Sequence, residues 1–298
     1  MFPIIPANSV TAISGNEEGI FGFGNDASSG YIGYSNLVSS SGVVASEVSA
    51  VGTGRGYLAA CEYGTDKAIF GYGYSTPTYY DETNLVSNVG VIASDVTGVG
   101  TDRRMLAACS YGDDKGIFGY GYTGSNVSMS NLVTNAGVVG SDVTGVGTAR
   151  QRIAATEYGI DKGIFGYGDA GGWLSMTNLV TNAGVIGDDV TGVGTARAYL
   201  GACGYGGDKA IFGYGAGPVS MTNLVTNAGV VGDNVTGVGT PREKPGACEY
   251  GTDKAIFGFG NNGPRLDMAN LVSNVGVVAD DTAAVGTARH APGACSFN

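Results

Sequence analysis

Residues 55–73 read RGYLAACEYGTDKAIFGYG, and this stretch decides the fold because it returns along the whole chain. Its central phenylalanine recurs at steps of 49, 48, 47, 47 and 45 residues. The six positions are Phe21, Phe70, Phe118, Phe165, Phe212 and Phe257. Self-similarity at such a period is the signature of a repeat architecture. The chain is therefore read as six copies of one unit.

The spacing within the unit separates constant segments from a variable one. An Asn-Leu-Val segment begins at Asn36, Asn84, Asn131, Asn178, Asn223 and Asn270. The arginine of a Thr-x-Arg segment lies 19 residues after the asparagine in every copy, and the next motif phenylalanine lies 15 residues after each of the first five arginines. Only the Phe-to-Asn stretch varies, with lengths of 15, 14, 13, 13, 11 and 13. Because insertions are tolerated in surface loops and resisted in packed elements, this stretch is predicted to contain a loop.

The residue types within a unit are those of strands and turns. Glycine accounts for 54 of 298 residues, and Val, Ile, Thr, Tyr and Phe gather in short runs between Gly, Asn, Asp and Ser. In the second unit we expect strand A at 57–63, strand B at 67–73, strand C at 83–87 and strand D at 90–96. Four short strands per unit of this length are typical of a β-propeller blade, with a β-solenoid as the minor alternative.

Strand B accounts for many of the glycines. Alternation across a pleat places Phe70 and Tyr72 on one face, and Ile69, Gly71 and Gly73 on the other. When sheets stack face to face, a strip of glycine can receive the aromatic rings of the neighbouring sheet. These aromatic residues are therefore predicted to form the core between units and to bind no ligand.

Residues 55–73 resemble the kelch repeat, in which an arginine opens the innermost strand and a second strand ends in a glycine pair. The likeness covers all six units, although here Tyr or Phe separates the glycines and the tryptophan usual late in a kelch unit is missing. The sequence of the repeat is most similar to kelch-like repeats in hypothetical proteins of marine tailed bacteriophages. The resemblance implies a propeller, and kelch propellers serve as adaptors, carbohydrate-binding modules or an oxidase.

The expected fold is all-β, with residues 1–298 forming a single six-bladed propeller of four-stranded antiparallel blades and residues 1–8 a short tail. Residues 289–297 are an extra copy of strand A, and residues 9–14 align with strand A as well. We expect the C-terminal copy to complete the first blade, because a ring closed by shared terminal strands leaves no exposed sheet edge. The N-terminal copy would be displaced, added at an edge or given to another subunit, which leaves a homo-oligomer open.

The composition limits the possible partners and cellular location of the protein. A formal charge of −11 and a pI near 4.4 argue against a nucleic-acid partner. No run of about 20 apolar residues and no basic leader are present, so neither membrane insertion nor a signal peptide is expected. A virion protein assembled in the host cytoplasm fits these features, and so does a cytoplasmic protein.

No cofactor, metal or catalytic constellation is expected. The cysteines lie six residues after a motif arginine, at Cys61, Cys109, Cys203, Cys248 and Cys295. They are interpreted as buried thiols, because equivalent positions on successive blades are too far apart for disulfides. A metal site would need closer Cys or His spacing, and His290 is the single histidine. The repeated Asp-Lys pairs are interpreted as turn residues, since a catalytic centre is normally one asymmetric constellation.

The variable segments are the candidate binding surface, here called the variable loop face. They span residues 25–34, 74–82, 122–127, 169–174, 216–219 and 261–266, and strand order places them beside the Thr-x-Arg segments. Tyrosine and tryptophan among small polar residues favour recognition, with unselected loop drift as the alternative. The candidate binding residues are Tyr31, Tyr34, Tyr79, Tyr80, Asp81, Trp173 and Arg265.

The repeated arginines allow two interpretations. Arg55, Arg103, Arg150, Arg197, Arg242 and Arg289 could ring the channel mouth and hold an anionic ligand such as an acidic sugar. Alternatively each could form a structural brace with the residue eight positions earlier. Those residues are Glu47, Asp95, Asp142, Asp189, Asn234 and Asp281, so a carboxylate is available in five units. The brace is the preferred interpretation.

These features predict a non-enzymatic structural and binding module. The resemblance points to a virion component such as a tail-tip, fibre or decoration protein, whose partners would be other virion proteins or a host-surface glycan. The alternatives are a cytosolic kelch-like adaptor and a glycan-active enzyme using Asp81 and Glu82.

Overall fold

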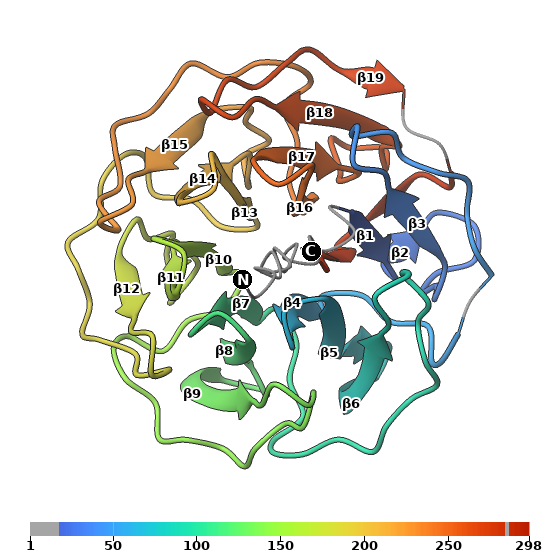
Figure 1. The fold of residues 1–298 in the computed structure, drawn as a ribbon, viewed down its shortest axis with the longest axis vertical. Helices are drawn as coiled ribbons and strands as arrows, with labels where there is room; N and C mark the ends of the chain where they lie inside the picture. The colour runs from blue at the N-terminus through green and yellow to red at the C-terminus, as the bar shows by residue number, and fades with distance from the viewer. Residues whose placement is uncertain (1–17, 50, 284–285, 298) are drawn as a thin grey trace, which may run out of the picture.

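The computed structural model describes residues 18–49, 51–283 and 286–297. All regular elements in this part of the chain are β-strands, assembled into small antiparallel sheets, most of three or four strands. Figure 1 shows these sheets arranged in a ring, with the first strand of each three-stranded set nearest the centre. The expectation of an all-β chain is confirmed.

Three strand positions recur in each unit. The inner strands are β4 (Ala59–Tyr63), β7 (Ala107–Tyr111), β10 (Ala154–Tyr158), β13 (Gly201–Tyr205), β16 (Gly246–Tyr250) and β21 (Gly293–Ser296). The middle strands are β1 (Gly19–Gly22), β5 (Lys67–Ser75), β8 (Lys115–Tyr122), β11 (Lys162–Gly166), β14 (Lys209–Gly213) and β17 (Lys254–Gly258). The outer strands are β3 (Ser35–Val38), β6 (Thr78–Val86), β9 (Asn126–Val133), β12 (Thr177–Val180), β15 (Thr222–Val225) and β18 (Met268–Val272).

The expected strand D is reduced to pairs of isolated bridges in most units. In the second unit Val86 pairs with Ile92 and Thr83 with Val96, without a continuous strand between them. The side-chain amide of Asn84 lies between these bridges and donates to the Ala93 carbonyl at 2.9 Å. This side chain replaces a backbone partner and interrupts the ladder. The exception is the short β19 (Thr282–Ala283), which pairs with β18.

One glycine of each middle strand receives an aromatic ring from the next unit, as predicted for Gly71, whereas Gly73 faces the Gly56 carbonyl and Leu58 of its own unit. A Cβ atom added to Gly71 would lie 2.7 Å from Cζ of Phe118, and one added to Gly258 would lie 2.8 Å from Cζ of Phe21. The same contact recurs between every pair of neighbouring units. Each hydrophobic cluster accordingly lies between two adjacent sheets. The units therefore stabilise one another through their faces.

The prediction that Phe70 and Tyr72 share a face is wrong. Phe70 contacts Phe23 of the preceding unit, whereas Tyr72 contacts Phe118 of the following one, with ring centroids 5.3 and 5.2 Å apart. Tyr72 has a left-handed backbone with φ of 65°, and the β5–β6 register shifts between Gly71 and Gly73. This bulge breaks the simple alternation, so a single strand sends one ring to each neighbour.

The C-terminal copy of strand A pairs with the first unit, as expected. Strand β21 is antiparallel to β1, with Ile20 opposite Cys295 and Phe21 opposite Ala294. The short strands β2 (Asn25–Asp26) and β20 (Arg289–His290) add a second pairing between the two ends of the chain. The N-terminal copy at residues 9–14 lies outside the described residues.

Backbone hydrogen bonds link the inner positions around the ring. The residues two positions after each motif arginine have φ between 51° and 60°. Each N–H donates to the carbonyl of its counterpart in the preceding unit, at 2.8–3.1 Å. The last residue, Ala291, accepts from Tyr57, so the circuit returns to its start. The residues in this circuit are Tyr57, Met105, Arg152, Tyr199, Lys244 and Ala291.

Candidate functional site

The variable loops lie beside the motif arginines, as strand order predicted. The Gly73 N–H donates to the Arg103 carbonyl at 3.0 Å, and the Gly56 N–H donates to the Tyr74 carbonyl at 2.9 Å. Neighbouring loops also touch one another, because the Asn126 amide donates to the Asp169 carbonyl at 3.1 Å. The variable loops therefore surround one end of the inner strands, and this ring of loops is called here the collar.

Tyr31 and Tyr79 belong to an aromatic cluster that spans three loops. The ring centroid of Tyr74 lies 5.7 Å from that of Tyr31 and 5.4 Å from that of Tyr79. Tyr79 in turn lies 6.5 Å from Tyr122 of the third unit. All four rings are partly exposed. Two predicted residues thus meet, together with two tyrosines that the prediction did not single out.

Arg104 lies among these tyrosines, and the sequence analysis missed it. Its guanidinium carbon is 4.3 Å from the ring centroid of Tyr74, 5.3 Å from that of Tyr79 and 5.5 Å from that of Tyr122. A cation over aromatic faces is attracted by the ring quadrupoles. The signal available in the sequence was the doubled arginine at 103–104, which occurs in no other unit.

The other predicted binding residues are distributed around the collar. The Tyr80 hydroxyl is 2.7 Å from the Ser75 hydroxyl, so this ring turns back onto its own hairpin. Tyr34 and Asp81 are partly buried, and the Tyr34 carbonyl accepts from the Phe23 N–H at 2.8 Å. Arg265 donates through Nε to the Asn25 carbonyl at 2.9 Å, which connects the last loop to the first.

Trp173 is well exposed and stands apart from the tyrosine cluster. Its side chain is 47% exposed, and its ring lies 3.4 Å from the position that a Cβ on Gly217 would occupy. The loop that carries it joins β11 to β12, across the ring from β1 and β3 in Figure 1. The predicted residues therefore do not form one patch.

A small cavity opens at the centre of this face and is called here the mouth cavity. It has a volume of about 80 Å³ and is lined by the residues of the backbone circuit and the apolar residues that follow them. Tyr199 lies under two cations, with Arg152 Cζ at 4.9 Å and Lys244 Nζ at 4.7 Å from its ring centroid. Burial raises the pKa of Tyr57 above its usual value, with a further contribution from Tyr199.

The six motif arginines are buried, so the channel-mouth ring for an anionic ligand is a wrong interpretation. Each side chain is at most 1% exposed. Arg55 donates through Nε to the Tyr72 carbonyl at 2.8 Å and through Nη2 to Asn84 Oδ1 at 2.6 Å. Its guanidinium carbon lies 4.5 Å from the Phe23 ring centroid. Burial lowers the pKa of these arginines, in the case of Arg289 to about 10.

The brace exists, but its partners differ from the expected ones. Arg55 pairs with Asp95 at 3.5 Å, whereas Glu47, eight residues before Arg55, pairs with Arg289 at 3.4 Å. The arginine inserts beneath the outer segment of its own unit, whose acidic residue lies about forty positions later. The same pairing joins Arg103 to Asp142, Arg150 to Asp189 and Arg242 to Asp281.

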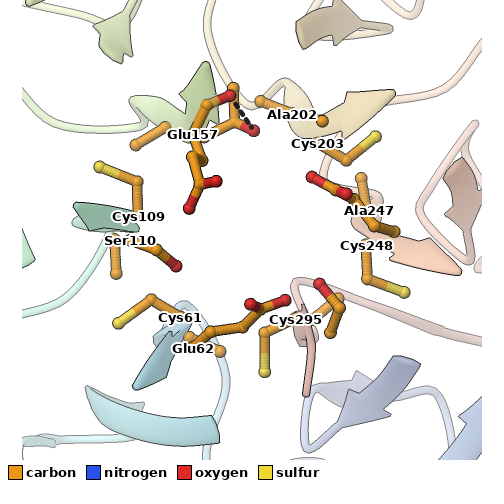
Figure 2. Close-up of a pocket in the computed structure, with 18 residues that line it drawn as sticks. Cys61, Glu62, Cys109, Ser110, Glu157, Ala202, Cys203, Ala247, Cys248 and Cys295 are labelled. Carbon is orange, nitrogen blue, oxygen red and sulfur yellow. Dashed lines mark hydrogen bonds between the residues drawn. The ribbon is translucent and has the colours of Figure 1, made fainter. Parts of the chain in front are cut away.

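A second cavity lies at the opposite end of the inner strands and is called here the carboxylate chamber (Figure 2). Its volume is about 220 Å³. The residue seven positions after each motif arginine alternates around it between glutamate and a small residue. In chain order these residues are Glu62, Ser110, Glu157, Gly204, Glu249 and Ser296. Figure 2 shows Glu62 and Glu157 directed towards the centre of the cavity.

Small residues between the glutamates make room for the carboxyl groups. A Cβ on Gly204 would collide with Glu249 Oε1, so this carboxyl occupies the space of the absent side chain. Burial, together with the charge of Glu62, raises the pKa of Glu249 to about 8. Burial and the two other glutamates raise the pKa of Glu157 well above its usual value. The chamber therefore retains protons near neutral pH.

The cysteines are free and buried, as predicted. Burial raises the pKa of each thiol, including that of Cys61, which keeps it in the unreactive protonated form. Across the described ranges, no group of three or more His, Cys, Asp or Glu side chains could hold a metal ion. In the same ranges no helix is long and apolar enough to cross a membrane.

No protein-family model matches the chain, and a search of curated proteins returned no significant match.

Proposed function

We propose that the chain is a single six-bladed, kelch-like β-propeller closed by its terminal strands. The six-fold repeat supports this reading, as do the antiparallel pairing of β21 with β1 and the backbone circuit that runs from Tyr57 to Ala291 and back. A closed ring would leave only short, protected sheet edges and would hold the loops at fixed positions.

This propeller serves as a non-enzymatic structural and binding module. The observation that carries the proposal is the tyrosine cluster around Arg104, because it lies on the one face where the units differ in length and sequence. Rigid aromatic side chains supply large contact area at small entropic cost, which suits recognition. The partner is a host-surface glycan or another protein, and the resemblance to phage repeat proteins supports a place in a virion as a tail-tip, fibre or decoration component.

The test compares host-cell binding and glycan-array binding of wild type with those of Tyr79→Ala and Trp173→Ala. Val138→Ala is the control, because Val138 is exposed in an outer segment away from the loops. Truncating a true anchor is expected to weaken binding by about 2 kcal/mol, with an unchanged melting temperature. Lower melting temperatures with undiminished binding would show that these rings only stabilise the collar. Mass spectrometry of purified virions would separate a virion component from a cytosolic adaptor.

A second candidate, a glycan-active enzyme, rests on Glu82. Its Oε2 atom is buried without a hydrogen-bond partner, and burial followed by repulsion from Asp95 raises its pKa. A carboxyl whose pKa is raised in this way is suited to general-acid catalysis, with Asp81 beside it in the sequence. Turnover of host polysaccharide that is abolished by Glu82→Gln would establish this activity, and absence of turnover by the wild-type protein would exclude it.

A further inference from the structure

The cations of this acidic chain fall into three groups that differ in burial and in how they are paired. Of its 15 Lys and Arg residues, six are the buried motif arginines. Five are the lysines of the turns between inner and middle strands, each paired with the preceding aspartate. The four that remain all lie on the variable loop face or around the mouth cavity: Arg104, Arg152, Lys244 and Arg265.

Several nitrogen atoms in this region are buried and lack a hydrogen-bond partner. They are Nε of Arg104, Nε of Arg152 and Nδ1 of His290. His290 stacks on Tyr57, a residue of the mouth cavity, with ring centroids 5.9 Å apart. Burying the Nε–H of Arg104 or Arg152 without an acceptor is costly, so an acceptor brought to either group would bring a gain.

The three cations nearest the mouth differ in how far they are neutralised. Arg152 pairs with Asp169 at 2.7 Å, and Lys244 pairs with Glu243 at 2.6 Å. Arg104 lies over tyrosine rings, and no carboxylate in the described part of the chain forms an ion pair with it. It directly precedes Met105, which lines the mouth cavity. Within the described residues Arg104 is therefore a guanidinium without an ion-pair partner, and it lies among the tyrosine rings at the edge of the mouth cavity.

We propose that Arg104 and the adjoining tyrosines bind a saccharide that carries a carboxylate, such as a uronic acid. This inference rests on the proposed recognition function and names its ligand class. A guanidinium binds a carboxylate through parallel hydrogen bonds in a fixed geometry. Tyr74 and Tyr79, which are partly exposed, provide apolar surface beside the guanidinium for the ring of the sugar. The anion-binding role that the sequence suggested for the motif arginines is thus assigned to Arg104.

The test uses a glucuronic-acid oligosaccharide and the same oligosaccharide with its carboxyls reduced to primary alcohols. Wild type is expected to bind the acidic form at least about tenfold more tightly, because only this form can make a charge-assisted hydrogen bond from its carboxylate to the guanidinium. Arg104→Gln removes this preference while retaining some affinity for both forms through the tyrosines. Arg104→Lys keeps the charge without the planar fork and recovers only part of the preference. Lys115→Gln, on the opposite face, leaves binding unchanged.

Equal binding of both oligosaccharides by wild type, or an undiminished preference in Arg104→Gln, would overturn the assignment. So would a wild-type protein that binds neither of them. The host-cell assay with Tyr79→Ala separates this failure from failure of the proposed function. Cell binding that depends on Tyr79 but not on Arg104 would leave recognition standing with a different ligand. Melting curves of all variants identify any loss that reflects misfolding.

Discussion

The buried arginine is the residue on which each unit is organised. In Arg150 the guanidinium donates to the Tyr167 carbonyl at 2.8 Å and to Asn178 Oδ1 at 2.7 Å, and it lies 4.4 Å from the Tyr120 ring centroid. Asp189 pairs with it at 3.8 Å. A buried charge is tolerated only when its donors and its charge are matched in this way.

One unit lacks the carboxylate, which makes it possible to measure the contribution of that group. Asn234 occupies the position of Asp189, and its side-chain oxygen accepts from the Thr195 N–H at 3.1 Å. Asn234→Asp is expected to raise the free energy of unfolding by about 0.5–1 kcal/mol, because the new carboxylate would face the buried Arg197. Urea denaturation at pH 7 measures the change, and Asn262→Asp in an exposed loop is the control. A destabilised variant would contradict the expectation.

The middle strand is the element that sets the distance between sheets. Glycine faces one neighbour where phenylalanine faces the other, and the left-handed residue after the glycine sends a second ring across the same interface. The middle strand of every unit repeats this arrangement. A side chain in place of the glycine would push two sheets apart rather than fill a void.

Gly166→Ala tests this interlock. The added Cβ would lie 2.7 Å from Cζ of Phe212, a fully buried ring, and the substitution is expected to destabilise the fold by about 1–3 kcal/mol. Gly172→Ala is the matched control, because a Cβ there meets no atom within 4 Å. Thermal or denaturant unfolding measures both. Equal stability of the two variants would mean that the sheets can separate without cost.

At the scale of the whole molecule, the ring brings together residues that are far apart in the chain. Glu62, Glu157 and Glu249 come from three different inner strands and meet in the carboxylate chamber. Burial raises the pKa of Glu62, and Ser296 from the last strand opposes the shift by a hydrogen bond. The raised pKa of Glu62 is thus a property of the assembled ring.

Stability should consequently fall as pH rises towards 8. Glu249 has a pKa of about 8 in the fold instead of 4.5, so the folded protein holds more protons than the unfolded chain between these values. The free energy of unfolding therefore decreases as pH rises through this window. His290, whose pKa burial lowers from 6.5 to about 4, acts with the opposite sign, but only below pH 6.5. The window from 6.5 to 8 therefore reports the titration of Glu249.

The measurement is the melting temperature between pH 6.5 and 8.5. In Glu249→Gln the melting temperature should decline less steeply with pH than in wild type. At pH 8 the free energy of unfolding of this variant should exceed that of wild type by about 1 kcal/mol or more. Asp267→Asn, an exposed carboxylate, serves as the control and should follow wild type. A Glu249→Gln curve parallel to that of wild type would show that the chamber carboxyls are solvated and ionise normally.

The parts of the candidate site that could be predicted are those visible as departures from the repeat. The variable segments, Tyr31, Tyr79 and Trp173 were found because the other units have different residues there. Arg104 and the alternating glutamates were missed, although the sequence contains both patterns. Their importance depends on which residues of other units lie around them, and spacing along one unit carries no information on that.

By itself the sequence determined the number of units, the inner and middle strands, the loop positions and the contact between glycine and phenylalanine. These follow from periodicity, because alternation and turn chemistry act between residues that are close in the chain. Only the tertiary structure decided which carboxylate faces each arginine, how the bulge at Tyr72 redirects a ring, and how the two central cavities are lined. The physical reason is that burial and charge act through space, and the ring places residues from separate units within a few ångströms of one another.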